Sequence, residues 1–166
     1  MFLITIDGPA GSGKTSLASL IHDHLTNTGE SVAAIHMDDL YNGWEDPLSL
    51  ALTSKIENII KEAKSQPTIT IPQFDWVKND FAQPLTIPTP QTLILEGVGS
   101  GQACTRPHVS ISIWIEAPRD VGFQRVLDRD GIDLLHQMQI WQRIESEHFS
   151  RESTKSAADY QVKSAP

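Results

Sequence analysis

The chain has 166 residues and a formal net charge of −8, and 39% of its residues are hydrophobic. This length suits one domain spanning residues 1–166, and the hydrophobic share excludes a disordered chain. The acidic balance argues against nucleic acid as the main partner, because a phosphate backbone attracts a basic surface. Cys104 is the single cysteine, so an internal disulfide is excluded and the cytoplasm is the expected location. No segment approaches the roughly 18 apolar residues of a membrane span, so no membrane contact is expected.

The first predicted element is an apolar strand at residues 2–6, followed by Gly8-Pro9-Ala10-Gly11-Ser12-Gly13-Lys14-Thr15. This run has the form G-x-x-x-x-G-K-[ST] of a phosphate-binding P-loop, and a helix is predicted after it at 14–27. In this context, backbone N–H groups and the helix N-terminus surround phosphates. Lys14 is expected to reach the β- and γ-phosphates of a nucleoside triphosphate, and the Thr15 hydroxyl to bind Mg²⁺. The predicted nucleotide-binding residues are Gly8, Ala10, Gly11, Ser12, Gly13, Lys14, Thr15 and Ser16.

The second predicted strand, at 32–37, leads into Asp38-Asp39-Leu40-Tyr41. Ligands of open α/β sheets bind at the carboxyl ends of the strands. A carboxylate at this position is therefore placed to accept a hydroxyl proton or to hold Mg²⁺, and we favour this role for Asp38. The alternative, in which Asp38 or Asp39 only caps the next turn, stays open, and the pattern does not decide the roles of Asp39 and Tyr41.

A second helix is predicted at 48–65, because apolar residues recur on one of its faces. The segment 66–90 then breaks the alternation of strands and helices. Residues 68–71 alternate with period two and are predicted to pair with residues 84–88. Prolines at positions 67, 72, 84, 88 and 90 confine these strands to an edge or to a separate hairpin. In an α/β fold, such a hairpin insertion tends to be a functional cover.

The third predicted strand, at 92–95, is followed directly by Glu96-Gly97. A charged side chain immediately after a buried strand needs a reason. This is the Walker B position, where an acid orients Mg²⁺, so we predict that Glu96 belongs to the metal site. The alternative is that Glu96 is a helix cap or a loop acid.

A fourth strand is predicted at 111–115, followed by a helix at 119–129. Arg125 and Arg129 are four residues apart and so share one face of this helix. Two arginines that face the phosphates stabilise the charge of a phosphoryl group in transfer. From spacing alone, however, a solvated face on which Arg125 pairs with Asp128 or Asp130 is the stronger interpretation.

A last helix is predicted at 133–153, and a short edge strand at 159–163. Trp141, Glu145 and His148 form one stripe of this helix, a spacing typical of core or interhelical packing. In this order, the elements predict an α/β fold with a doubly wound parallel sheet of about five strands and a small hairpin insertion at 66–90.

The order of these motifs resembles the uridine kinase-like branch of the P-loop small-molecule kinases, which are related to nucleoside monophosphate kinases. The motifs that carry the resemblance are the P-loop, residues 38–41, Phe74-Asp75-Trp76, Leu95-Glu96-Gly97 and the helix with Arg125 and Arg129. The resemblance implies a P-loop kinase fold with a short lid helix at 119–131. It also implies that Asp38 is the general base for the acceptor hydroxyl, and that Arg125 and Arg129 are lid arginines. The sequence departs from the family at Asn79 and Phe81, which stand near the positions of the family's nucleoside-gripping His and Arg.

We therefore predict an ATP-dependent kinase that uses ATP and Mg²⁺ and phosphorylates a hydroxyl of a small molecule. The predicted catalytic residues are Lys14, Asp38, Arg125 and Arg129, and the predicted metal-site residues are Thr15, Asp38 and Glu96. The predicted acceptor-binding residues are Asp38, Tyr41, Phe74, Asp75 and Trp76. A nucleoside-like acceptor is favoured, because aromatic side chains suit a flat ring.

Two other functions stay open at this stage. A nucleoside monophosphate kinase would need a further basic site for the acceptor phosphate, for which Lys78, Arg106 and Arg119 are the candidates. An ATP-binding regulatory module would bind ATP without acceptor-stimulated release of ADP. The sequence also leaves open whether the chain forms a homodimer.

Overall fold

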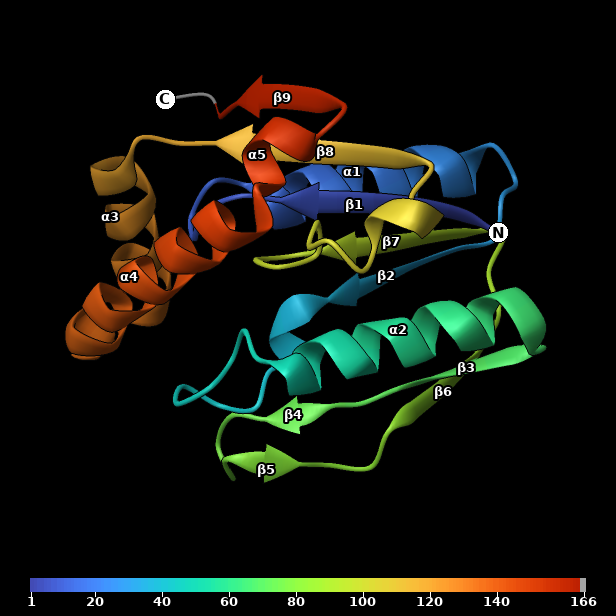
Figure 1. Cartoon of the computed structure of the whole chain (residues 1–166), viewed down its shortest axis with the longest axis horizontal. Coiled ribbons are helices and arrows are strands. Elements are labelled where there is room, and N and C mark those ends of the chain that lie inside the picture. Colours follow the sequence, from blue (N-terminus) through green and yellow to red (C-terminus); the bar gives the residue numbers. More distant parts are fainter. Residues whose placement is uncertain (165–166) are drawn as a thin grey trace.

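The computed structural model describes residues 1–164. Within that range the main sheet has five strands in the order β2-β7-β1-β8-β9, and every neighbouring pair is parallel (Figure 1). The strands are β1 Phe2–Asp7, β2 Val32–His36, β7 Thr92–Glu96, β8 Ile111–Glu116 and β9 Tyr160–Lys163. The chain moves from β1 to β2 on one side and later from β7 to β8 on the other. The carboxyl end of β1 therefore lies at the point where the strand order reverses, which is the usual ligand position in such sheets.

Helices cover both faces of this sheet (Figure 1). The helices are α1 Lys14–Asn27, α2 Leu50–Ser65, α3 Arg119–Asp130, α4 Leu135–Glu152 and α5 Thr154–Ala157. Successive strand residues point to opposite faces. Accordingly, Leu3 and Leu93 pack in one apolar cluster with α2, while Ile4 and Ile94 pack in a second cluster with α1. The predicted doubly wound parallel sheet is confirmed.

The segment predicted to be a hairpin insertion forms two small antiparallel sheets beside α2 (Figure 1). One pairs β3 Thr68–Ile71 with β6 Leu85–Pro88, and the other pairs β4 Phe74–Asp75 with β5 Asp80–Phe81. Ile69 and Ile71 are buried while Thr68 and Thr70 are exposed, so one face of β3 packs on the protein. The turn between β4 and β5 contains Asn79 in a left-handed conformation, with φ of 53°. The position of β4 brings Trp76 close to the end of β2.

Several element boundaries differ from the prediction by one or two residues, with local causes. Helix α2 begins at Leu50 rather than at residue 48, because Ser49 at its N-cap has an extended backbone. The second strand ends at His36, and Met37–Asp39 form a 3-10 turn, η1, that carries Asp38. Helix α4 begins at Leu135, after a short 3-10 turn, η3, at Ile132–Leu134. A further 3-10 turn, η2, lies at Arg106–His108.

The loops that carry the predicted motifs gather at one end of the sheet. Figure 1 shows α3 and α4 at the end to which β1, β7 and β8 point. The P-loop follows β1, η1 follows β2, and the Glu96-Gly97 segment ends β7. Within residues 1–164, no helix combines the length and the apolar character needed to cross a bilayer.

Candidate active site

A cavity of about 660 Å³ lies between the P-loop, η1 and the helices α3 and α4. Its volume lies within the range of small-molecule sites. Its lining includes Ala10, Gly11, Gly13, Lys14, Thr15, Ser16, Asp38, Glu96, Arg125 and Arg129. Four aromatic side chains, Tyr41, Trp44, Trp76 and Trp141, also line it. Most of the predicted nucleotide, metal and catalytic residues therefore share one cavity with an aromatic wall.

The P-loop backbone adopts positive φ angles at Gly8, Gly11 and Gly13. Gly8 has φ of 147°, and a Cβ atom placed on it would lie 2.1 Å from the Ile115 carbonyl oxygen, so no larger residue fits there. Gly8 and Ser12 are not among the residues that line the cavity. Within residues 1–164, the buried hydroxyl of Ser12 has no hydrogen-bond partner. A loop of this shape with an unpaired hydroxyl group fits a bound phosphate chain.

Lys14 lies at the centre of this site and is 8% exposed. Its ammonium group donates hydrogen bonds to the carbonyl oxygens of Gly8 at 2.9 Å and Pro9 at 2.8 Å. Burial lowers its pKa, while nearby carboxylates, Asp7 first among them, oppose that shift. Lys14 thus folds back on its own loop, and a phosphate oxygen would be an alternative partner of the same kind.

The predicted metal-site residues offer oxygen atoms that suit Mg²⁺. The Thr15 hydroxyl donates a hydrogen bond of 3.0 Å to Glu96 Oε1, and Glu96 is 4% exposed. Asp38 lines the same cavity. Among the described residues, no cluster of three or more His, Cys, Asp and Glu side chains is arranged to hold a metal. Mg²⁺ needs no such cage, since it is usually held by one or two carboxylates together with water and substrate phosphates.

The surroundings of Asp38 keep its proton affinity high. Burial raises the pKa of its carboxyl group, Lys14 lowers it, and the carboxylate of Glu96 raises it again. A carboxylate with a raised pKa is a better proton acceptor for a hydroxyl group. The backbone carbonyl of Asp38 accepts a hydrogen bond of 3.2 Å from the Trp76 indole N–H. The structure therefore brings Asp38 and Trp76 together at the cavity.

The aromatic wall includes Trp44 and Trp141, which were not among the predicted acceptor residues. The Trp44 ring lies 5.2 Å from that of Trp76 and 6.1 Å from that of Trp141, in edge-to-face arrangements. Tyr41 is 1% exposed, and its hydroxyl donates a hydrogen bond of 2.8 Å to the Val98 carbonyl oxygen. Tyr41 therefore supports the wall, and its hydroxyl already has a partner in the protein.

Two predicted acceptor residues do not reach the cavity. Phe74 is buried against Trp76 and Phe81, with ring centroids 5.1 Å apart in each pair. Asp75 accepts hydrogen bonds of 3.0 Å from the backbone N–H groups of Val77 and Lys78, which fixes the β4–β5 turn. The structure thus places these two residues outside the cavity lining: Phe74 packs against Trp76, and Asp75 forms hydrogen bonds within its own turn.

Arg125 and Arg129, the two arginines predicted for a lid, have different partners. Arg125 donates a hydrogen bond of 3.3 Å to the Gly11 carbonyl oxygen, so it contacts the P-loop rather than lying on a solvated face. Arg129 forms a two-point contact with the neighbouring Asp130, with both N–O distances at 2.7 Å. Both arginines line the cavity. The side chain of Arg129 is exposed, whereas Arg125 is partly buried.

His36 and Glu145 belong to the site but were missed by sequence reasoning. The His36 ring contacts the Glu96 carboxylate, and this contact raises the pKa of His36. Glu145 accepts a hydrogen bond of 2.9 Å from the Ala10 backbone N–H. Its position in a stripe with Trp141 was interpreted as packing. The signal that could have found it is the charge itself, since a buried carboxylate needs a partner.

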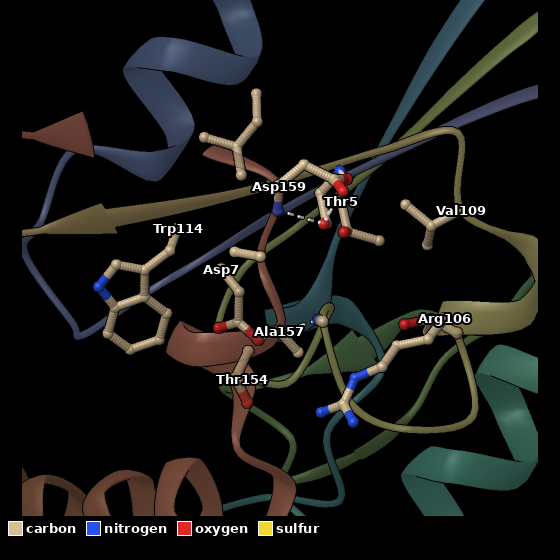
Figure 2. Close-up of a pocket in the computed structure, with 13 residues that line it drawn as sticks. Thr5, Asp7, Arg106, Val109, Trp114, Thr154, Ala157 and Asp159 are labelled. Carbon is tan, nitrogen blue, oxygen red and sulfur yellow. Dashed lines mark hydrogen bonds between the residues drawn. The ribbon is translucent and has the colours of Figure 1, made fainter. Parts of the chain in front are cut away.

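A second cavity, of about 150 Å³, lies beside β1 and β8 on the side of α5 (Figure 2). Asp7 borders it and is 2% exposed. Its carboxylate accepts hydrogen bonds from the backbone N–H groups of Gly8, Gly99 and Gly101. Burial nevertheless raises the pKa of Asp7 to about 6. Asp7 thus joins the first residue of the P-loop to the loop that follows β7.

Comparison with known proteins shows similarity to nucleotide-related kinases. No protein-family model matches the chain. A cytidylate kinase from Methanococcoides burtonii is 32% identical over 131 residues, covering 78% of this chain and 63% of that protein. A uridine kinase from Mannheimia succiniciproducens is 28% identical over 145 residues, covering 77% of this chain and 67% of that protein. A structure described as a possible uridine kinase from Bacillus stearothermophilus has a TM-score of 0.72 at 20% identity, covering 97% of this chain and 88% of that chain.

These similarities differ in what they establish. The sequence matches span about two thirds of the length of the two relatives, 63% of one and 67% of the other. The structural match, at 20% identity, establishes the fold. Taken together, they confirm the α/β fold and the resemblance that the order of the motifs predicted.

Proposed function

We propose that the chain is a P-loop kinase and that it transfers the γ-phosphoryl group of ATP to a hydroxyl of a nucleoside-like molecule. The observation that carries the proposal is the shared cavity, in which the P-loop and Asp38 face a wall of tryptophan side chains. The phosphate end of the cavity suits ATP. The aromatic end suits a flat ring, because such rings stack on or pack edge-on to aromatic side chains.

Each residue has a role that follows from its position. Lys14 exchanges its carbonyl partners for phosphate oxygens, and Arg125 and Arg129, which line the same cavity from α3, add positive charge. Asp38 accepts the proton of the acceptor hydroxyl as the new bond to phosphorus forms. Thr15, Asp38 and Glu96 would hold Mg²⁺ directly or through water. When bound with ATP, Mg²⁺ would supply positive charge that stabilises the phosphate oxygens.

A nucleoside monophosphate is the second candidate acceptor, because one relative is a cytidylate kinase. Such an acceptor needs cations for its own phosphate in addition to those for ATP. Among residues 1–164, the cations that line the cavity are Lys14, Arg125 and Arg129, which the ATP phosphates need. The three candidates for an extra site have other positions: Lys78 pairs with Asp75, Arg119 bonds Gln142, and Arg106 borders the second cavity. This distribution favours an unphosphorylated acceptor.

The test is release of ADP, measured by a coupled assay against uridine, cytidine, their 5′-monophosphates and hydroxyl-bearing vitamins. We expect a nucleoside or a similar neutral ring compound to stimulate ADP release, and the monophosphates to have little effect. Stronger stimulation by a monophosphate would favour the second candidate. If ATP binds but no acceptor stimulates its turnover, the protein is better described as an ATP-binding regulatory module.

The variant Asp38→Asn tests the proposed general base in the same assay. The change keeps the shape of the side chain but removes its charge and basicity. We expect ATP binding to stay within about threefold, while acceptor-stimulated ADP release falls about 10²-fold or more, the usual scale for loss of a general base. Unchanged stimulated turnover in this variant would remove Asp38 from the mechanism.

We also propose the cytoplasm as the location of the protein. Cys104 has no disulfide partner and is partly buried, and burial raises the pKa of its thiol to about 11. Such a thiol is poorly reactive, which suits a reducing compartment but does not require one. Fractionation of the native host with a cytosolic marker enzyme would test the location.

A further inference from the structure

The tip of the P-loop, which consists of Ala10 and Gly11, packs directly against lid helix α3. Gly11 has φ of 73°, and a Cβ atom placed on it would lie 2.1 Å from the Gly122 carbonyl oxygen. A Cβ atom on Gly122 would lie 2.6 Å from the Ala10 carbonyl oxygen. The two backbones therefore meet with no side chain between them. Arg125, one turn further along α3, adds its hydrogen bond to the Gly11 carbonyl oxygen.

Helix α4 also contacts this tip, through Glu145. Glu145 Oε2 accepts the Ala10 backbone N–H at 2.9 Å, across 135 positions of sequence. The carboxyl group of Glu145 also accepts a hydrogen bond from the side chain of Trp141. Glu145 is 5% exposed, and burying a carboxylate is costly unless it is hydrogen-bonded. The charged groups that act on it from packed elements are Lys14 and Asp7.

We propose that Glu145 is a positioning residue for nucleotide binding, which fixes the P-loop tip by holding the Ala10 amide from helix α4. The inference rests on the proposed function, since it assumes that the P-loop receives the phosphates of ATP. With the Ala10 N–H bound to Glu145, the tip cannot rotate unless this hydrogen bond breaks. The loop is thus ordered before the nucleotide arrives, and binding does not have to supply the free energy of ordering it.

Three variants separate this role from simple packing. Glu145→Leu keeps the bulk of the side chain but removes the acceptor, whereas Glu145→Gln keeps an amide oxygen that accepts the Ala10 N–H. Glu147→Gln is the matched control, because Glu147 lies on the exposed side of the same helix. Binding of ATP with Mg²⁺ is measured by calorimetry, and thermal unfolding is measured without nucleotide. We expect the Kd for ATP to rise about tenfold or more in Glu145→Leu, and to stay within about threefold in Glu145→Gln and Glu147→Gln.

Hydrogen exchange of the Ala10 amide, followed by NMR without nucleotide, tests the contact itself and does not depend on the stability of a variant. We expect this amide to exchange slowly in the wild-type protein, and fast exchange would overturn the inference. Equal ATP affinity of wild type and Glu145→Leu, even with a lower Tm for the variant, would show a purely structural role and would also overturn it. If the wild-type protein itself does not bind ATP, the proposed function fails, and this inference fails with it.

Discussion

Lys14 is a buried cation surrounded by carboxylates, and this balance explains how the P-loop can be stable without nucleotide. Burial alone would favour the neutral amine. Asp7 and Glu145 counteract that effect, and the carbonyl oxygens of Gly8 and Pro9 accept the hydrogen bonds of the ammonium group. A phosphate chain replaces these neutral acceptors with charged ones, so the interaction becomes stronger when ATP binds.

Lys14→Ala should therefore strongly slow phosphoryl transfer while leaving the fold in place. We expect kcat to fall about 10²- to 10³-fold, the usual scale for removal of one group that stabilises transition-state charge. Thermal unfolding should show a single transition, as in the wild type. Lys61→Ala serves as the control, because Lys61 lies on the exposed side of α2. Turnover near the wild-type level in Lys14→Ala would contradict the proposed site as a whole.

At this scale, sequence reasoning predicted the candidate-site residues that belong to compact motifs, and the structure places them in one cavity. The P-loop spacing identifies Lys14 and Thr15, and the strand-then-acid pattern identifies Asp38 and Glu96. Glu145 is different, because its partner lies 135 positions away and only the packing of α4 against the P-loop joins them. A helical stripe does not distinguish a buried carboxylate with a partner from an ordinary packing position.

The hairpin insertion is the element that brings Trp76, a proposed acceptor residue, to Asp38, the proposed general base. Trp76 is 37% exposed, its ring packs near Trp44 and Phe74, and its N–H holds the Asp38 carbonyl oxygen. Under the proposed function, the element contributes both a ring surface for the acceptor and a hydrogen bond to the Asp38 backbone.

Two substitutions of Trp76 should separate these contributions. Trp76→Ala should raise the KM for the acceptor about tenfold or more, because stacking on a base contributes roughly 1–3 kcal/mol. Trp76→Phe keeps a ring but loses the N–H, so it should lower kcat more than it raises KM. ATP affinity should stay nearly constant in both variants, as it should in the exposed control Val77→Ala. Equal acceptor KM values in wild type and Trp76→Ala would remove Trp76 from the acceptor pocket.

In the hairpin insertion, the pairing of strands could be predicted from the sequence, but the direction of individual side chains could not. Proline positions and period-two alternation predicted the β3–β6 hairpin, because both are local properties of the chain. Which side chains of residues 74–76 face the cavity depends on the short β4–β5 ladder and its turn. Asp75 was assigned to the acceptor but bonds to its own turn, since an aspartate readily accepts backbone N–H groups two and three residues ahead.

At the scale of the whole molecule, the stability of the fold depends on buried carboxyl groups at the site whose protonation favours the folded state. Burial raises the pKa of Asp7 and of Glu145 to about 6 in each case, from ordinary values of 3.8 and 4.5. Buried His148 acts in the opposite direction, because its pKa is lowered to about 4 and the folded state favours the neutral ring. These groups titrate over overlapping pH ranges, so the stability curve of the wild type alone does not separate them.

A comparison of wild type with Glu145→Gln isolates one of these groups. In the folded protein Glu145 binds a proton more tightly than in the unfolded chain, so its contribution to stability is full below about pH 4.5 and is lost as the pH rises through about 6. Relative to the glutamine variant, the free energy of unfolding of the wild type should therefore fall by about 2 kcal/mol between pH 4 and pH 7. Urea unfolding of both proteins at several pH values measures this difference. The contribution of His148 cancels in it, whereas that of Asp7 cancels only in part, because the charges of Asp7 and Glu145 act on each other. A difference that stays constant over this range would mean that the Glu145 carboxyl group does not titrate with a raised pKa.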